Sequence, residues 1–172
     1  EFSPYESALA SKLVDVAIHE NLDILHVHYA VPHASVAFLA QQILIQKDIY
    51  LPIITTLHGT DITLVGNDPS YKPVVELGIN KSDSVTAVSN FLRDATNEQF
   101  RINKDIEVIY NFIDLSRFRK VNKDHFKKMI APNGEKVIAH MSNFRKVKRV
   151  EDVVSIFARI RDNFPAVLLM IG

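Results

Sequence analysis

The sequence has 172 residues, the length of about one domain at ~150 residues per domain. It carries 20 basic and 20 acidic side chains, and this zero net charge argues against a protein that binds polyanions through bulk charge. Apolar residues make up 47% and charged residues 23%, so the chain can bury a core and is not disordered. It contains no cysteine, which excludes a disulfide scaffold, a thiolate metal site and a cysteine nucleophile. The same absence fits a reducing, cytoplasmic compartment.

Apolar runs that are typical of strands alternate with segments of helical periodicity. Helices are expected at residues 7–20, 32–46, 71–80, 89–100 and 150–163. Strands are expected at residues 23–28, 52–57, 83–88, 106–110, 136–140 and 166–171. This alternation indicates βαβ units and a parallel sheet. The run at residues 23–28 is almost continuously apolar, which is typical of a buried parallel strand. Ser89 is expected to cap the helix that follows it.

Between residues 114 and 135 the alternation gives way to a polar, basic stretch that includes Pro132-Asn133-Gly134. Such a composition is typical of a linker between domains. We therefore expect most of one domain at residues 1–120, a linker at 121–135 and the start of a second domain at 136–172. The chain has only 5 glycines in 172 residues, about 3% against a usual ~7%. Its last residues form an expected apolar strand. These features predict a piece of a longer polypeptide.

Polar clusters follow several of the expected strands, where ligands bind in open parallel sheets. His26 and His28 share one face of the first strand and could chelate a metal together with His33. No carboxylate lies close by in the sequence to complete such a site, so a histidine hydrogen-bonded at a strand end is the favoured reading of His26. Tyr29 comes next, where its phenol can reach a ligand.

The second strand ends on His58-Gly59-Thr60-Asp61. Gly59 permits a tight turn or a close backbone approach, and Asp61 or Thr63 can cap such a turn. A histidine, a hydroxyl and a carboxylate crowded at one strand end exceed what a turn needs. We therefore favour a functional role for His58 and Thr60.

Residues 145–149 carry four cations in five positions, between an expected strand and an expected helix. Backbone N–H groups at the helix start, the helix dipole and the Lys and Arg side chains would together bind phosphate. A solvated charge run is the usual alternative for such clusters. The position at the carboxyl end of a strand, in an otherwise neutral chain, favours phosphate.

Five segments resemble the retaining family 4 glycosyltransferases of the GT-B type. They are HVHYAVPHA (26–34), TTLHGTDIT (55–63), KSDSVTAVSNFL (81–92), VIYNFIDLSRF (108–118) and MSNFRKVKRVEDVV (141–154). Their amino-acid sequences are similar to those of the branch that transfers N-acetylglucosamine from UDP-N-acetylglucosamine to the hydroxyl of L-malate, the first step of bacillithiol synthesis. The resemblance implies an α/β fold with two Rossmann-like parallel-sheet domains facing a cleft, here incomplete at both ends.

The resemblance also implies roles for single residues. Family members hold the donor diphosphate with an Arg and a Lys five residues apart, and these positions fall on Asn143 and Lys148. The Arg is thus replaced, and Arg145 is expected to supply the cation. His58 resembles the family histidine that contacts the donor sugar near the reacting centre, so it is the expected catalytic residue.

The acceptor side follows from the same resemblance. Tyr29 and Thr60 match positions that bind the acceptor carboxylates in the related inositol-using enzyme of mycothiol synthesis, and Lys72 is a further candidate. A malate dianion needs several donors, and a phenol, a hydroxyl and a cation are chemically suitable.

The resemblance implies two substrates, UDP-N-acetylglucosamine and L-malate, with no cofactor and no metal, and no Asp-x-Asp occurs in the sequence. Neither a nucleic acid nor a membrane is an expected partner, and a homo-oligomer stays open. The alternatives are a family 4 transferase with another acceptor, or a non-enzymatic α/β fragment that binds a polyanion. The family's Gly-rich loop and paired glutamates would lie outside these 172 residues, so this polypeptide alone is expected to be inactive.

Overall fold

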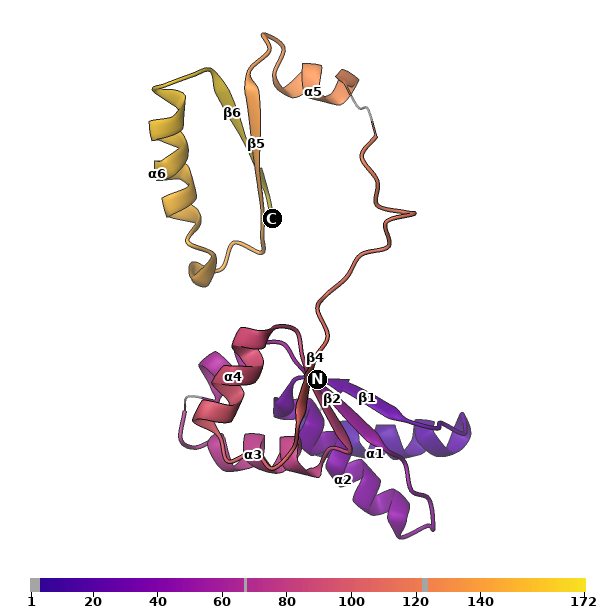
Figure 1. Cartoon of the computed structure of the whole chain (residues 1–172). Helices are drawn as coiled ribbons and strands as arrows, with labels where there is room; N and C mark the ends of the chain where they lie inside the picture. Colours follow the sequence, from indigo (N-terminus) through magenta and orange to yellow (C-terminus); the bar gives the residue numbers. More distant parts are fainter. Residues whose placement is uncertain (1–3, 67, 122–123) are drawn as a thin grey trace. The chain divides into compact units, whose positions relative to one another are not determined.

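The computed structural model describes residues 4–66, 68–121 and 124–172. The chain divides into two compact units, Glu1–Phe112 and Ile113–Gly172, each of which is described by itself. Both units consist of parallel strands and helices, so the expected α/β class with parallel sheets is confirmed (Figure 1). In the part of the chain that the structure describes, no helix is long and apolar enough to cross a membrane.

The first unit is a four-stranded parallel sheet in the order β1-β2-β3-β4. A helix precedes the sheet, and helices connect its strands, as the alternating pattern predicts. Two short π-helical turns, η1 and η2, follow β1 and β2 and were not expected from the sequence. The elements are α1 (Tyr5–His19), β1 (Leu25–His28), η1 (Ala30–Ala34), α2 (Ser35–Ile45), β2 (Ile53–Leu57), η2 (Asp61–Val65), α3 (Lys72–Lys81), β3 (Ser84–Ala87), α4 (Asn90–Gln99) and β4 (Ile106–Val108).

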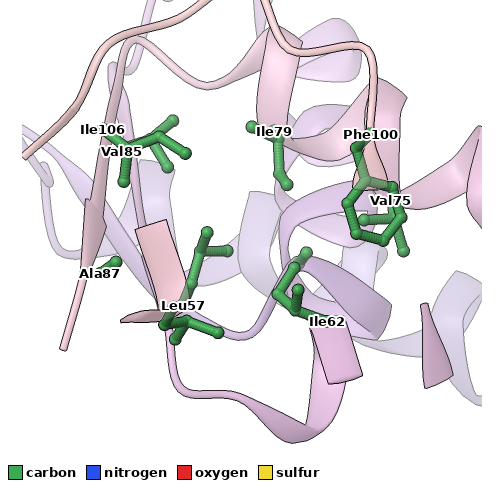
Figure 2. Close-up of a cluster of buried hydrophobic side chains, with 10 residues drawn as sticks. Leu57, Ile62, Val75, Ile79, Val85, Ala87, Phe100 and Ile106 are labelled. Carbon is green, nitrogen blue, oxygen red and sulfur yellow. The ribbon is translucent and has the colours of Figure 1, made fainter. Parts of the chain in front are cut away.

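The core of the first unit lies between the helices and one face of the sheet. Leu25 and Ile53 pack with buried residues of α1 and α2. Leu57, Val85 and Ile106 pack with buried residues of α3 and with the region around α4, and Figure 2 shows this cluster. Each large apolar side chain buried in this way stabilises the fold by about 1.5–3 kcal/mol.

The opposite face of this sheet is uncovered among the described residues. Of the alternate strand positions, His26, Ser84 and Glu107 are exposed, whereas Thr56 and Thr86, whose hydroxyls hydrogen-bond to each other, are buried. The expectation of a buried strand at residues 23–28 is therefore wrong for most of its side chains: within β1, Leu25 is buried, but His26 and His28 are exposed. The reason is that successive side chains point to opposite faces of a strand, and the described helices pack on one face only.

Ser89 caps α4, as the sequence predicts. Its backbone is extended (φ −161°, ψ 158°), and its Oγ accepts a hydrogen bond of 3.2 Å from the N–H of Leu92. This bond satisfies one of the N–H groups that the first turn of a helix leaves without a partner. The short polar side chain therefore sets where α4 begins, directly after β3.

The second unit contains a two-stranded parallel sheet in which Lys136 pairs with Ala166 and Met141 with Ile171. A helix lies within the segment that the sequence predicts as a linker, where Phe126, Met129 and Ile130 have helical spacing. Residues 122–123 of that segment lie outside the described residues, and the expected domain bounds stay a prediction. The elements are α5 (Asp124–Ile130), β5 (Lys136–Met141), η3 (Lys146–Lys148), α6 (Val150–Arg161) and β6 (Ala166–Ile171).

Candidate functional site

Histidines gather at the carboxyl ends of β1 and β2. The Nδ1 of His28 lies 2.8 Å from the Nε2 of His58, and their ring centroids are 4.9 Å apart. The ring of His26 lies 4.8 Å from that of His28, and its Nε2 is 2.8 Å from the Oγ1 of Thr56. A neutral imidazole donates from one nitrogen and accepts at the other, so one member of the His28–His58 pair donates to its partner.

The surroundings of His58 lower its pKa below the ordinary value. Burial is the largest cause, and the neighbouring His28 acts in the same direction, whereas the carboxylate of Asp61 opposes the shift. Burial favours the neutral ring because charge is poorly solvated there. The lowered pKa favours the neutral imidazole, which donates a hydrogen bond from one nitrogen and accepts one at the other.

Tyr29 lies beside His58, with ring centroids 5.1 Å apart. Its backbone has φ 79° and ψ 132°, a region that residues other than glycine rarely adopt. The N–H of Tyr29 donates to the carbonyl of Thr56 at 2.9 Å, so the strained residue is tied to β2. Strained backbones persist only where the surroundings over-determine them, and they cluster at ligand sites.

Asp61 also belongs to this region, although the sequence by itself suggests only a turn cap for it. Its side chain is 1% exposed. One carboxylate oxygen accepts from the N–H of Gly59 at 2.9 Å, and the other accepts from the N–H of Ala30 at 2.8 Å. The first bond is the local turn that the sequence suggests. The second joins residues 31 positions apart, and no pattern in the sequence reveals it.

The two remaining acceptor candidates lie in different surroundings. Thr60 is exposed and directly precedes η2, in the same loop as His58. Lys72 begins α3, and its Nζ lies 5.8 Å from the ring centroid of Phe100. The structure therefore brings Tyr29, His58 and Thr60 to neighbouring loops, but it records no contact that joins Lys72 to them.

The geometry does not support the hypothesis that His26, His28 and His33 chelate a metal. The ring of His33 is turned toward its own loop, with Nδ1 2.6 Å from the carbonyl oxygen of His28. His26 and His28 have their hydrogen-bonding partners on β2 and in the loop after it. Across the described ranges, no three His, Asp or Glu side chains are arranged to hold a metal ion.

A pocket of about 360 Å³ opens on the uncovered face of the first sheet. His28 and His58 lie at the end of this pocket that is formed by β1 and β2. Tyr29 and Thr60 are not among its lining residues. The wall combines polar and apolar side chains: His26, His28, Ile54, Thr56, His58, Ser84, Thr86, Val88, Glu107, Ile109, Tyr110, Asn111 and Phe112.

The basic loop of the second unit surrounds a hollow of about 510 Å³ at the start of α6. Of the three expected diphosphate ligands, Arg145 lines this hollow, whereas Asn143 and Lys148 do not. The first turn of α6 already carries two carboxylates, Glu151 and Asp152. Asp152 forms an ion pair with Arg149, which weakens the pull of that helix start on an anion.

The cationic side chains of this loop differ in whether they form an ion pair. Arg149 adopts a left-handed backbone (φ 49°) between η3 and α6 and is held by Asp152. Within the described ranges, Arg145, Lys146 and Lys148 form no ion pair, and all three are exposed. Their charges are therefore available to an anionic ligand.

The α/β fold with polar side chains at its strand ends can be compared with known protein families. The sequence pattern of Glycosyltransferase Family 4 matches residues 2–117. The chain therefore belongs to glycosyltransferase family 4. This assignment agrees with the resemblance carried by the segments at residues 26–34 and 55–63.

Two curated proteins are similar to the chain in sequence. The chain is 50% identical over its whole length to the N-acetyl-alpha-D-glucosaminyl L-malate synthase of Bacillus anthracis, and it covers 45% of that protein. It is 30% identical over 95 residues to an uncharacterised glycosyltransferase of Methanocaldococcus jannaschii, which takes in 55% of the chain and 25% of that protein. The chain thus spans less than half the length of either relative.

Proposed function

We propose that the full-length protein is a retaining glycosyltransferase that moves N-acetylglucosamine from UDP-N-acetylglucosamine to the hydroxyl of L-malate. This reaction is the first step of bacillithiol synthesis. The observation that carries the proposal is the 50% identity, over the entire chain, to the malate synthase of Bacillus anthracis. Membership of glycosyltransferase family 4 supports the reaction class independently of the acceptor.

The acceptor would lie at the carboxyl ends of β1 and β2. Tyr29 and Thr60 offer two hydroxyl donors on neighbouring loops, and both side chains are exposed. Hydrogen bonds to an ionised carboxylate are about twice as strong as neutral ones, so two hydroxyls would contribute substantially to malate binding. Lys72 would add a positive charge if the acceptor extends toward α3.

In the proposed reaction the diphosphate leaves from the same face of the sugar that the acceptor approaches. The bond between the sugar C1 and the diphosphate oxygen breaks, and a bond forms between C1 and the malate hydroxyl oxygen. The hydroxyl proton passes to the leaving diphosphate, so no side chain acts as a nucleophile. His58, whose lowered pKa favours the neutral ring, would orient the donor sugar through a hydrogen bond.

The protein's main contribution would then be electrostatic. Negative charge develops on the leaving diphosphate, and cations placed there in advance stabilise the transition state more than the ground state. Arg145 and Lys148 are our candidates, with Asn143 as a neutral hydrogen-bonding partner. We expect no metal in this step, so turnover should be unchanged by a chelator such as EDTA.

A product analysis tests the proposal. The full-length protein is incubated with UDP-N-acetylglucosamine and either L-malate, inositol or a sugar phosphate, and the products are identified by mass spectrometry. We expect N-acetylglucosaminyl malate, with retained anomeric configuration by NMR. A product formed only with another acceptor would overturn the choice of malate and leave the transferase class intact. Absence of any glycoside would overturn both.

A further inference from the structure

We infer that Asp61 is a positioning residue, which sets the distance between the loops after β1 and β2 and so holds Tyr29 beside His58. The inference deepens the proposed function and rests on it for the meaning of the Tyr29–His58 arrangement. Asp61 does not itself touch a substrate in this assignment. It acts through the backbone of the two residues that follow Tyr29 and His58.

The contacts of the carboxylate carry the inference. Oδ2 of Asp61 accepts from the N–H of Ala30, the residue after Tyr29, at 2.8 Å. Oδ1 accepts from the N–H of Gly59, the residue after His58, at 2.9 Å. One rigid group thus connects the two loops at the residues that follow Tyr29 and His58, whose ring centroids lie 5.1 Å apart.

The burial of Asp61 makes these two bonds obligatory. The side chain is 1% exposed and forms no ion pair with any residue in the described ranges. A buried carboxylate without a cation is unfavourable unless hydrogen bonds satisfy it. A turn cap needs only the bond to Gly59. The bond to Ala30 is the additional feature: besides satisfying the second carboxylate oxygen, it joins the loop after β2 to the loop after β1.

The backbone at Tyr29 is a reason why the loop after β1 needs such a restraint. Tyr29, one residue before the bonded Ala30, has φ 79°, and the bonded Gly59 has φ 117°. For Tyr29 this conformation is costly, because its side chain crowds the backbone there. A charge-assisted bond from the next N–H offsets that cost. Asp61 therefore over-determines a conformation that would otherwise relax.

The test compares Asp61→Asn with Asp83→Asn in the full-length protein. Asparagine has a single acceptor oxygen, so it can keep one of the two bonds of Asp61 and must turn an N–H₂ group toward the other N–H. Asp83 is the matched control: its Oδ2 accepts from the N–H of Ile53 at 2.8 Å, at the opposite end of β2. The other oxygen of Asp83 accepts from the hydroxyl of Tyr50, so the same substitution there also removes one of two acceptor oxygens, at the end of β2 away from His58.

We expect Asp61→Asn to raise the KM for malate by about tenfold or more, the effect of losing one charge-assisted bond that holds the acceptor loop. The affinity for UDP should stay within about twofold, because the donor diphosphate is bound elsewhere in the proposed site. Asp83→Asn should change neither quantity. Equal effects of the two substitutions on malate KM, or a loss confined to thermal stability, would overturn the positioning role.

A second measurement does not depend on which acceptor is used. The groups that face the His58 ring are His28, His26, Asp61 and Tyr29. Because the Asp61 carboxylate opposes the lowering of the His58 pKa, its removal should lower that pKa further in an NMR titration. An unchanged His58 pKa in Asp61→Asn would contradict the geometry even if malate proved to be the acceptor.

Amide hydrogen exchange covers the case in which Asp61→Asn does not fold. In the unsubstituted protein the amides of Ala30 and Gly59 should exchange about as slowly as that of Tyr29, which donates to Thr56. Exchange at the rate of a free peptide would overturn the inference. If the protein shows this protection but makes no malate glycoside, the positioning role of Asp61 stands and only the proposed function is overturned.

Discussion

The Nδ1 of His28 and the Nε2 of His58 share one hydrogen across 2.8 Å, at the point where β1 and β2 end. One nitrogen of His58 is thereby engaged, and its other nitrogen is left for a ligand. Because the pair has one hydrogen between two ring nitrogens, a ligand bond at His58 depends on which tautomer His28 selects. The sequence suggests only a metal-ligand role for His28, whereas in the structure its ring is hydrogen-bonded to His58.

Replacing His28 should raise the pKa of His58. In the full-length protein, His28→Gln removes a group that lowers this pKa, while burial, the larger cause, remains. The pKa should therefore rise only part of the way toward its ordinary value of about 6.5. An NMR titration of the His58 ring measures the shift. His19→Gln, on α1, is the control and should leave the titration unchanged; the same titration in both variants would contradict the pairing.

The lowered pKa of His58 also predicts how stability depends on pH. As pH falls below about 6.5, the unfolded chain takes up a proton at this residue before the folded protein does. Stability from the neutral ring is thus complete above that pH and decreases as pH falls through the window below it. Denaturant midpoints measured between about pH 7.5 and pH 5 should fall less in His58→Gln than in the unsubstituted protein. A steeper fall in the variant would have the wrong sign.

The hydroxyls of Tyr29 and Thr60 should matter for the acceptor and not for the donor. Tyr29→Phe and Thr60→Val keep the shape and remove one hydroxyl each. The KM for malate should rise by about tenfold in each variant, as expected for one hydrogen bond to a charged group. UDP affinity by calorimetry should not change. Tyr5→Phe on α1 is a matched control, and unchanged malate kinetics in both test variants would move the acceptor elsewhere.

Lys148→Ala should weaken UDP binding by about ten- to a hundredfold, because a charge-assisted contact contributes roughly 1.5–3 kcal/mol. Lys146→Ala is the comparison, since Lys146 lines the hollow at the start of α6 and Lys148 does not. We expect little change from Lys146→Ala. Calorimetry showing the reverse order would assign the diphosphate to the hollow with Arg145 and Lys146, against the position that the family pattern indicates.

Lys72→Met separates two roles of one cation. The ammonium lies over the ring of Phe100, a contact that contributes about 0.5–1 kcal/mol at exposed sites. If Lys72 also binds the acceptor, as we predict, the KM for malate should rise severalfold in addition to any small loss of stability. A lower melting temperature with unchanged malate KM would leave Lys72 as a structural residue of α3.

Much of the local structure could be predicted because it depends on neighbours in the chain. Ser89 caps α4 through a bond to Leu92, three residues on, and this pattern is visible in the sequence. The strands and their parallel pairing follow from apolar runs alternating with helices. The exposure of the sheet face that carries His26 could not be predicted, because an apolar run does not show which face of the strand a helix will cover.

For the candidate site, the sequence by itself determined which residue types stand at the strand ends: Tyr29 after one strand, His58 and Thr60 after the next. Only the tertiary structure decided how these ends combine. Asp61 looks like a local cap until β1 and β2 pair, and its bond to Ala30 then spans 31 positions. The His28–His58 contact likewise arises from strand pairing. Hydrogen bonds between distant residues depend on the register of the sheet, which no short stretch of sequence encodes.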